Sequence, residues 1–176
     1  DRMTEPSTTE KGGGSFEGIK LLLCENPLQP IDEAIEAATD AIPRSNYYTE
    51  PYSEPLRDQL AEHLGVATEH VHLNAGSELI LRQLFDRFGE VVHLLTPTYP
   101  LFPEIAEKYT ETKLHPGDDF MFDLSELAVP DQTSLVVIVN PNNPNGGTFD
   151  MSPLPGILDQ YRDTTFLVDE AFIDLA

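Results

Sequence analysis

The segment SLVVIVN, residues 134–140, places the strongest constraint on how this chain can fold. It is an almost uninterrupted run of β-branched and aliphatic residues, and TTFLVDEA at 164–171 is similar in kind. Strands that are apolar at successive positions are buried on both faces, as in a parallel sheet covered by helices. A strand with one face in water would alternate between apolar and polar residues instead.

Helical and extended patterns alternate along the chain. We expect helices at 30–42, 53–64, 77–88, 100–109 and 152–161, and further strands at 71–73, 91–96 and 111–116. Pro55 in the first turn after Ser53 favours a helix start, and Gly65 and Gly89 favour helix ends. This alternation predicts an α/β fold with a mainly parallel sheet, whose ligands bind at the carboxyl ends of the strands.

The composition narrows the choice of partners and compartment. The chain has 31 acidic and 10 basic residues and a formal net charge of −21, which disfavours nucleic acid because phosphates require a basic face. Only four basic residues are Lys, which favours a salt-rich cytoplasm over an ordinary acidic protein. The lone Cys24 excludes an internal disulfide and fits a reducing cytoplasm. No apolar run reaches the roughly 18 residues of a membrane span.

Chemically useful residues follow several predicted strands. In HLNAGSELI, residues 72–80, Ala75, Gly76 and Ser77 lead into a helix. Gly76 lets the backbone approach a ligand closely, and the helix start offers free N–H groups, so this turn can hold a phosphate. A capped helix without a ligand is the simpler alternative.

Two further strand ends carry an aromatic and an acidic side chain. Tyr99 lies between Pro97 and Pro100 in a stiff loop, where it can stack on a planar ligand or simply pack in the loop. Asp169 ends an apolar strand, where a carboxylate is costly unless it meets a positive partner such as a protonated ring nitrogen. An ordinary surface carboxylate is the alternative.

The loop NPNNPNGG, residues 140–147, holds more amides than a turn requires. In order and spacing, this loop and the other strand ends resemble pyridoxal-phosphate-dependent aminotransferases of class I/II, with the PLP-transferase fold type I. The stretches CENPLQP (24–30), YYTEPYSEPLRDQLAEHLGV (47–66) and VDEAFIDLA (168–176) add to the resemblance, which runs from about Leu21 onward. Within this family the chain most resembles histidinol-phosphate aminotransferase and its neighbour, threonine-phosphate decarboxylase. A nucleotide-binding Rossmann domain is disfavoured because no G-x-G-x-x-G follows a strand.

The resemblance implies roles for residues that match the family's motifs. Ala75, Gly76 and Ser77 would bind the phosphate of the cofactor, pyridoxal 5'-phosphate. Tyr99 would stack on its pyridine ring, and Asn143 would hydrogen-bond the ring hydroxyl.

The remaining implied roles concern the ring nitrogen, the dimer and the substrate. Asp169 would pair with the pyridine nitrogen and keep it protonated, so that the ring acts as an electron sink. Tyr48 would reach the cofactor phosphate of the neighbouring subunit of a homodimer. Glu25 and Asn26 would line the way to the substrates, an amino acid or amino phosphate such as histidinol phosphate, and 2-oxoglutarate.

Some positions depart from the family pattern. Asn145 replaces the usual Thr, and Phe172 stands where aminotransferases of this branch have Tyr. DEAFID and NAGSELI look more like the decarboxylase, whereas CENP looks more like the aminotransferase, so both activities stay open. We expect Asn142 and Asn145 simply to satisfy turn backbone, while the prolines and Gly146 hold the loop in one shape.

The resemblance also implies a fragment. The chain starts with Asp1 rather than Met, and the family's Schiff-base lysine lies in a Ser-Lys motif well after the aspartate. None of the four lysines follows Asp169 (Lys11, Lys20, Lys108, Lys113). We expect a mobile arm at 1–14, an amino-terminal segment at 15–45 and the first half of the large, PLP-binding domain at 46–176. A truncated, non-catalytic remnant is the alternative. The five histidines are scattered, and none is assigned to a metal.

Overall fold

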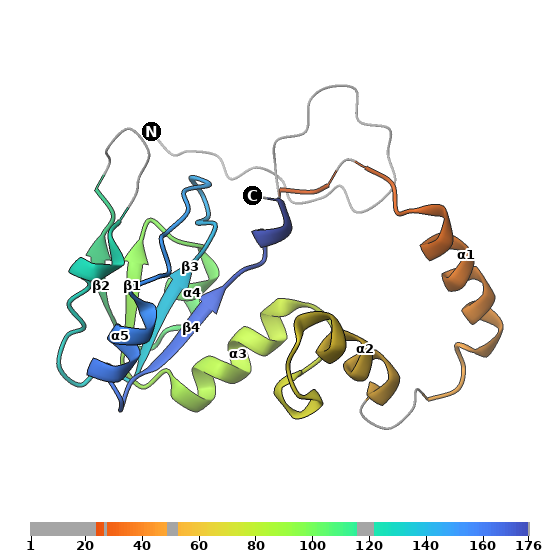
Figure 1. Ribbon diagram of the computed structural model, residues 1–176, viewed down its shortest axis with the longest axis horizontal. Coiled ribbons are helices and arrows are strands. Elements are labelled where there is room, and N and C mark those ends of the chain that lie inside the picture. The colour runs from red at the N-terminus through yellow and green to blue at the C-terminus, as the bar shows by residue number, and fades with distance from the viewer. Residues whose placement is uncertain (1–23, 27, 49–52, 116–121, 176) are drawn as a thin grey trace, which may run out of the picture. The chain divides into compact units, whose positions relative to one another are not determined.

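The computed structural model describes residues 24–26, 28–48, 53–115 and 122–175, so the arm predicted at 1–14 lies outside the described residues. The chain divides into two compact units, Asp1–Tyr52 and Ser53–Ala176. In the first unit, helix α1 (Asp32–Ala41) lies within the helix predicted at 30–42, and none of its residues is buried. A 3-10 turn, Ile42–Arg44, follows it (Figure 1).

The second unit contains a four-stranded parallel sheet in the order β2-β1-β3-β4 (Figure 1). Its strands are β1 (Val92–Thr96), β2 (Tyr109–Lys113), β3 (Leu135–Val139) and β4 (Thr165–Asp169). Its α-helices are α2 (Glu54–Leu64), α3 (Ser77–Phe88), α4 (Leu101–Ile105) and α5 (Leu154–Gln160). All three strand pairs are parallel, which confirms the predicted α/β architecture.

Helices cover both faces of this sheet, because its central strands β1 and β3 are mostly apolar and almost wholly buried. On one face, Leu81 and Phe85 of α3 and Phe102 of α4 pack against alternate residues of β1 and β3. On the other face, Ile157 of α5 packs with Val136 and its neighbours. All five residues of β3 are buried, as expected for a parallel strand at the centre of three layers.

Two predicted elements, the helix at 100–109 and the strand at 111–116, have bounds that bear on how the chain between them folds. The helix predicted at 100–109 ends at Ile105, since the backbone of Ala106 is already extended. The strand predicted at 111–116 begins earlier, at Tyr109, which pairs with Val92 at the start of β1. The β-branched and aromatic side chains at 109–112 suit a strand better than a helix, which explains both corrections.

The strand predicted at 71–73 is wrong, because these residues join no sheet in the described part of the chain. The backbone of Val71 is extended, but its carbonyl oxygen accepts a hydrogen bond from Arg57 Nε at 3.0 Å. Arg57 Nη2 also donates to the carbonyl of Thr68 at 2.8 Å. A side chain from α2 therefore takes the place of a neighbouring strand.

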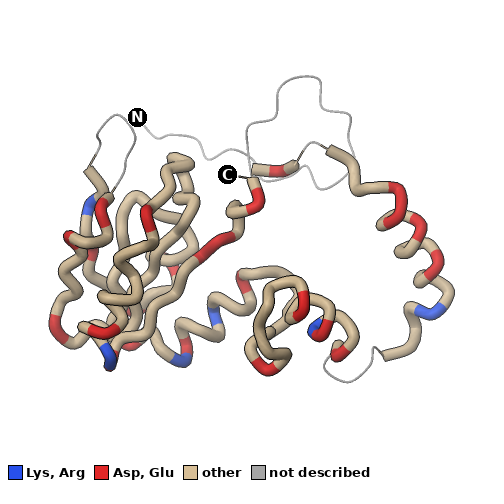
Figure 2. Tube along the Cα trace, in the orientation of Figure 1, with Lys and Arg blue, Asp and Glu red and all other residues tan. Residues whose placement is uncertain are grey.

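Acidic residues recur along both units, and basic residues are few (Figure 2). Ion pairs such as Arg82–Glu78 at 2.8 Å and Arg162–Asp159 at 2.6 Å lie on the surface, where each pair contributes little stability. With 31 acidic and 10 basic residues, most carboxylates cannot have a basic residue of their own. Repulsion among them is therefore the dominant electrostatic feature of the surface.

Candidate functional site

The loops that follow β1, β3 and β4 meet at the carboxyl edge of the sheet. Asn140 N donates to the carbonyl of Asp169 at 2.9 Å, which joins the end of β3 to the end of β4. Asn142 Nδ2 donates to the carbonyl of Pro97 at 3.0 Å, which joins the loop after β3 to the loop after β1. The segments that carry Tyr99, Asn143 and Asp169 are therefore neighbours.

Three of the four asparagines in NPNNPNGG are used to hold this edge together. Asn140 Oδ1 accepts from Phe149 N at 2.9 Å, and Asn145 Oδ1 accepts from Gly147 N at 3.1 Å. Asn142 Nδ2 donates to both Pro97 and Asn145. Asn145 thus satisfies turn backbone as predicted, whereas Asn142 does more than predicted, because it links two loops.

The side chain of Asn143 is the exception. It is half-buried, and no hydrogen bond to another described residue involves its amide. The loop around it is shaped by Gly146, whose φ of +73° suits glycine and whose N–H donates to Asn142 O at 2.7 Å. The loop therefore presents one amide that remains able to bond a ligand.

Tyr99 is held by an aromatic contact in the loop after β1. Its half-buried ring meets the ring of Phe102 edge-on, with centroids 5.7 Å apart and planes at 86°. Phe102 is completely buried in α4. The core therefore fixes the orientation of Tyr99, whichever of its two predicted roles it has.

Asp169 is the last residue of β4 and is half-buried. Its Oδ1 accepts a hydrogen bond from Ala171 N at 3.0 Å. No described residue bonds its other carboxylate oxygen. One oxygen thus orients the carboxylate, and the second is left for a partner.

The turn before α3 has the backbone shape expected of an anion-binding turn. Gly76 has a φ of +88°, and a Cβ placed on it would meet no atom within 4 Å. Ser77 is the first residue of α3, so it lies in the first turn, and the residue before the helix provides no side-chain cap. The N–H groups of Ala75 and Gly76 bond back to Asn74, at 2.8 and 3.0 Å. The first turn of α3 therefore has no N-cap side chain to accept hydrogen bonds from its N–H groups.

The helix α3 runs opposite to the strands. Its last residue, Phe88, accepts a hydrogen bond from Ser134 Oγ at 2.6 Å, just before β3 begins. The carboxyl end of α3 thus lies at the amino edge of the sheet, and its amino end is directed toward the carboxyl edge. No hydrogen bond among the described residues joins Ala75, Gly76 or Ser77 to the loops of Tyr99 and Asn143.

The other predicted site residues belong to the first unit. Glu25, Asn26 and Tyr48 are all exposed, and Asn26 Oδ1 accepts from Leu28 N at 2.9 Å. Their roles toward substrate and the neighbouring subunit stay predictions.

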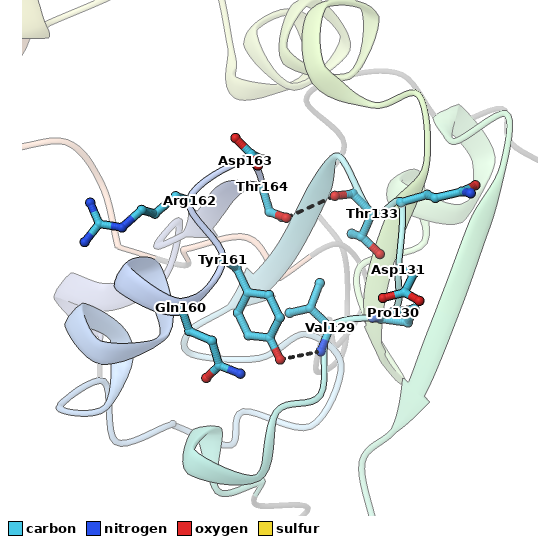
Figure 3. Close-up of a pocket in the computed structure, with 10 residues that line it drawn as sticks. Val129, Pro130, Asp131, Thr133, Gln160, Tyr161, Arg162, Asp163 and Thr164 are labelled. Atoms are coloured by element: carbon cyan, nitrogen blue, oxygen red, sulfur yellow. Dashed lines mark hydrogen bonds between the residues drawn. The ribbon is translucent and has the colours of Figure 1, made fainter.

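A pocket of about 280 Å³ lies elsewhere, at the amino edge of the sheet (Figure 3). It is lined by the segment before β3 and the segment between α5 and β4, residues 129–133 and 160–164. There Tyr161 Oη accepts from Val129 N at 3.4 Å, and Thr164 Oγ1 donates to Thr133 O at 3.0 Å. Because Tyr99, Asn143 and Asp169 lie at the opposite ends of the strands, this pocket is separate from the candidate site.

The described residues also bear on two other kinds of site. No three or more His, Cys, Asp or Glu side chains gather there in a way that could hold a metal ion. Within the same residues, no helix is long and apolar enough to cross a membrane.

Comparison with known proteins identifies the family to which the chain with these strand-end motifs belongs. The family model for aminotransferase class I and II matches residues 18–176. The chain belongs to this family. Its members depend on pyridoxal phosphate, so the cofactor predicted from the resemblance is confirmed.

Relatives and solved structures agree with the family. A histidinol-phosphate aminotransferase of Moorella thermoacetica is 31% identical over 92% of this chain and 44% of its own length. An aromatic amino acid aminotransferase of Thermobifida fusca is 34% identical over 91% of this chain and 46% of its own length. The chain thus spans less than half the length of these relatives.

The solved structures confirm fold type I. An aspartate aminotransferase double mutant of Thermus thermophilus has a TM-score of 0.74 and 24% identity, over 84% of this chain and 44% of its own. L-threonine-O-3-phosphate decarboxylase of Porphyromonas gingivalis has a TM-score of 0.68 and 21% identity, and the match covers 80% of this chain and 44% of the decarboxylase. At such identities the likeness concerns the fold alone, so it does not choose between the two activities.

Proposed function

We propose that this chain forms the amino-terminal part of a pyridoxal-phosphate-dependent aminotransferase. The whole protein would transfer an amino group between an amino acid or amino phosphate, such as histidinol phosphate, and 2-oxoglutarate. The observation that carries the proposal is the unsatisfied side-chain amide of Asn143. Of the four asparagines in this loop, three have side chains that hydrogen-bond other residues, whereas the amide of Asn143 bonds no described residue and lies at the edge that also carries Tyr99 and Asp169.

The residues present fit pyridoxal phosphate. The open space at the Cβ position of Gly76 and the uncapped start of α3 suit a phosphate, which helix N-termini bind through N–H groups and the helix dipole. The hydroxyl of Ser77 would add a donor there, and Ala75 N would join it by exchanging its acceptor Asn74 Oδ1 for the phosphate. Tyr99, oriented by Phe102, would cover the pyridine ring, and the free amide of Asn143 would bond the ring hydroxyl.

Asp169 would hold a proton on the pyridine nitrogen. Its Oδ1 accepts from Ala171 N and its Oδ2 bonds no described residue, so Oδ2 would be the oxygen that accepts from a protonated ring nitrogen. When bound, pyridoxal phosphate supplies an electron sink for negative charge at the substrate's α-carbon. The carboxylate strengthens that sink because it keeps the ring nitrogen positive.

The first unit and the rest of the protein would complete the site. We infer that Tyr48 reaches the cofactor phosphate of the neighbouring subunit in a homodimer, and that Glu25 and Asn26 line the substrate path. The Schiff-base lysine would come from outside this chain, as would the groups that choose the substrate. We place the protein in the cytoplasm, which suits its one cysteine, and a halophilic source would account for its acidity.

The first experiment uses the protein expressed from its whole natural gene. It is mixed with pyridoxal phosphate and reduced with borohydride, and its mass is measured. A covalent adduct, together with glutamate formed from 2-oxoglutarate and histidinol phosphate, supports the aminotransferase. Carbon dioxide released from threonine phosphate without glutamate would support the decarboxylase instead. Absence of any adduct would favour a non-catalytic remnant and overturn the enzyme proposal.

Asp169→Asn tests the role of the carboxylate. We expect its turnover to fall by about tenfold to a hundredfold, since an uncharged amide loses a charge-assisted contact. The matched control is Asp163→Asn, an exposed position at the amino end of β4. Equal turnover in the two variants would contradict the assignment of Asp169.

A further inference from the structure

Asn142 is a buried amide that lies between two loops of the candidate site. Its side chain is only 3% exposed. Its Nδ2 donates to Pro97 O in the loop after β1 and to Asn145 Oδ1 in its own loop, both at 3.0 Å. Its backbone N donates to Gly147 O, and its carbonyl accepts from Gly146 N, both at 2.7 Å. The residue is thus fixed by its own loop and holds the other one.

The direction of these hydrogen bonds is determined by the backbone. Pro97 O can only accept, so the NH₂ group of Asn142 must face it. Asn145 Oδ1 must face Gly147 N–H, which leaves an oxygen toward Asn142. Rotating either amide by half a turn would set two donors or two acceptors against each other. The link between the loops therefore has one stable arrangement.

This arrangement leaves an unpaired donor as a consequence. Asn145 Nδ2 is buried and has no partner among the described residues. Buried polar groups in proteins are normally satisfied, and an exception calls for an explanation. Here Asn145 orients its oxygen to serve Asn142 and Gly147, and its own NH₂ group is left without an acceptor. The unpaired Asn145 Nδ2 is therefore a cost of the hydrogen bond between Asn142 and Asn145.

The link joins the two residues with predicted roles on the cofactor ring. Pro97 lies two residues before Tyr99, and Asn142 is bonded directly to Asn143. Tyr99 is also anchored from the core by Phe102. A shift of the Asn142 side chain would therefore change the distance between Tyr99 and Asn143.

We propose that Asn142 is a positioning residue that sets the separation of Tyr99 and Asn143 and so the seat of the pyridine ring. It acts through these two neighbours and touches neither cofactor nor substrate. The inference rests on the proposed function, because it requires Tyr99 and Asn143 to contact the cofactor.

The test measures binding of pyridoxamine phosphate to the protein from its whole natural gene. This compound has the pyridine ring and phosphate but no aldehyde, so it cannot condense with a lysine. Its dissociation constant is measured by fluorescence, and circular dichroism of the bound compound reports the asymmetry of the ring's surroundings. We expect Asn142→Ala to weaken binding about tenfold and to change the dichroic band. The variant loses the hydrogen bond that links the two loops, and tenfold in affinity corresponds to roughly the contribution of one hydrogen bond.

A matched control separates positioning from general loosening. Asn140 is also buried, lies in the same loop and bonds Phe149 N, but it does not reach the loop of Tyr99. Asn140→Ala should lower the melting temperature yet leave the dichroic band unchanged. If Asn142→Ala does not fold, Asn142→Ser keeps a donor in a smaller side chain and should show part of the loss.

The outcomes distinguish this inference from the proposed function. If Asn143→Ala weakens binding while the folded Asn142 variants bind like wild type, the positioning role is overturned and the cofactor site stands. Equal spectral changes in Asn140→Ala and Asn142→Ala would also overturn it. Wild-type protein that does not bind pyridoxamine phosphate would overturn the inference and the proposed function together.

Discussion

The ring of Phe85 in α3 stacks on the ring of Phe102 in α4, with centroids 5.7 Å apart and planes 8° from parallel. The same Phe102 ring meets Tyr99 edge-on at 5.7 Å. These contacts form a short path from the helix that begins at Ser77 to the aromatic residue of the loop after β1. Two parts of the candidate site that share no hydrogen bond are therefore connected through the core.

Phe102→Ala should lower the free energy of unfolding by about 3–5 kcal/mol, the usual cost of removing a buried aromatic ring. The reason is that Phe102 is fully buried and contacts the rings of both Phe85 and Tyr99. Urea unfolding of the whole protein measures the change. Leu158→Ala removes a half-exposed apolar side chain from α5 and should cost much less. Similar losses for both variants would show that Phe102 is not central to the core.

Gly146→Ala should destabilise the protein by about 1–2 kcal/mol, because a Cβ at a φ of +73° is strained even where space is available. Gly156→Ala is the control, since Gly156 lies in α5, where an added Cβ meets nothing within 4 Å. That variant should gain about 0.5–1 kcal/mol, the preference of a helix for Ala over Gly. Thermal unfolding of both variants gives the comparison, and a stabilised Gly146→Ala would refute the strain argument.

His93 predicts a pH dependence of stability. Its ring is 1% exposed, and Nδ1 and Nε2 lie 2.7 and 3.0 Å from the hydroxyls of Thr110 and Thr112. Burial lowers the pKa of His93 below its ordinary value of 6.5. As the pH falls through about 6.5, His93 binds a proton in the unfolded chain but stays neutral in the folded protein. The free energy of unfolding therefore decreases as the pH falls.

His93→Gln keeps hydrogen-bonding groups but cannot take up that proton. Between about pH 7 and 5, the free energy of unfolding of wild type should fall more steeply than that of the variant, by up to about 1.4 kcal/mol per pH unit. Urea unfolding at several pH values measures both slopes, and the difference cancels the contribution of the carboxylates. His63→Gln, at an exposed position of α2, controls for loss of an imidazole. Identical slopes for wild type and His93→Gln would contradict the pKa direction.

The convergence of Tyr99, Asn143 and Asp169 could be predicted because it follows from connectivity. Each residue stands just after an apolar strand, and parallel strands end at one edge of a sheet. The resemblance singled out Asn143 for the cofactor, but the sequence did not reveal that Asn142 would link this loop to the loop after β1. Asn142 and Asn143 are adjacent and alike, and only the path of the backbone turns one toward Pro97 and leaves the other unbonded.

The wrong strand at 71–73 has a similar cause. Val71 and Leu73 have strand-like side chains, but the partner of the Val71 carbonyl is Arg57, fourteen residues earlier. No local pattern announces such a contact, because a guanidinium group on an exposed helix usually points to water. Local propensity thus predicted the extended backbone correctly and its pairing incorrectly.

The surface charge predicts that salt stabilises this protein. The chain carries 31 carboxylates against 10 basic side chains, and acidic residues recur along both units (Figure 2). Folding brings these like charges closer together than they are in the unfolded chain, so repulsion opposes folding. Raising the ionic strength from 0.1 to 1 M shortens the screening length from about 10 Å to about 3 Å, which is less than most spacings between surface charges. The melting temperature should therefore rise with KCl, most steeply at low concentration.

The control for this prediction is a neutral osmolyte at equal osmolality, because excluded solutes also favour the compact state without screening charge. KCl should raise the melting temperature more than the osmolyte does. Replacing several exposed acidic residues of α1 with Gln and Asn, at Asp32, Glu33 and Glu36, should reduce the difference, since fewer like charges remain to be screened. A melting temperature that KCl and the osmolyte raise equally would show that the acidity does not oppose folding, and the argument for a salt-rich cytoplasm would lose its physical basis.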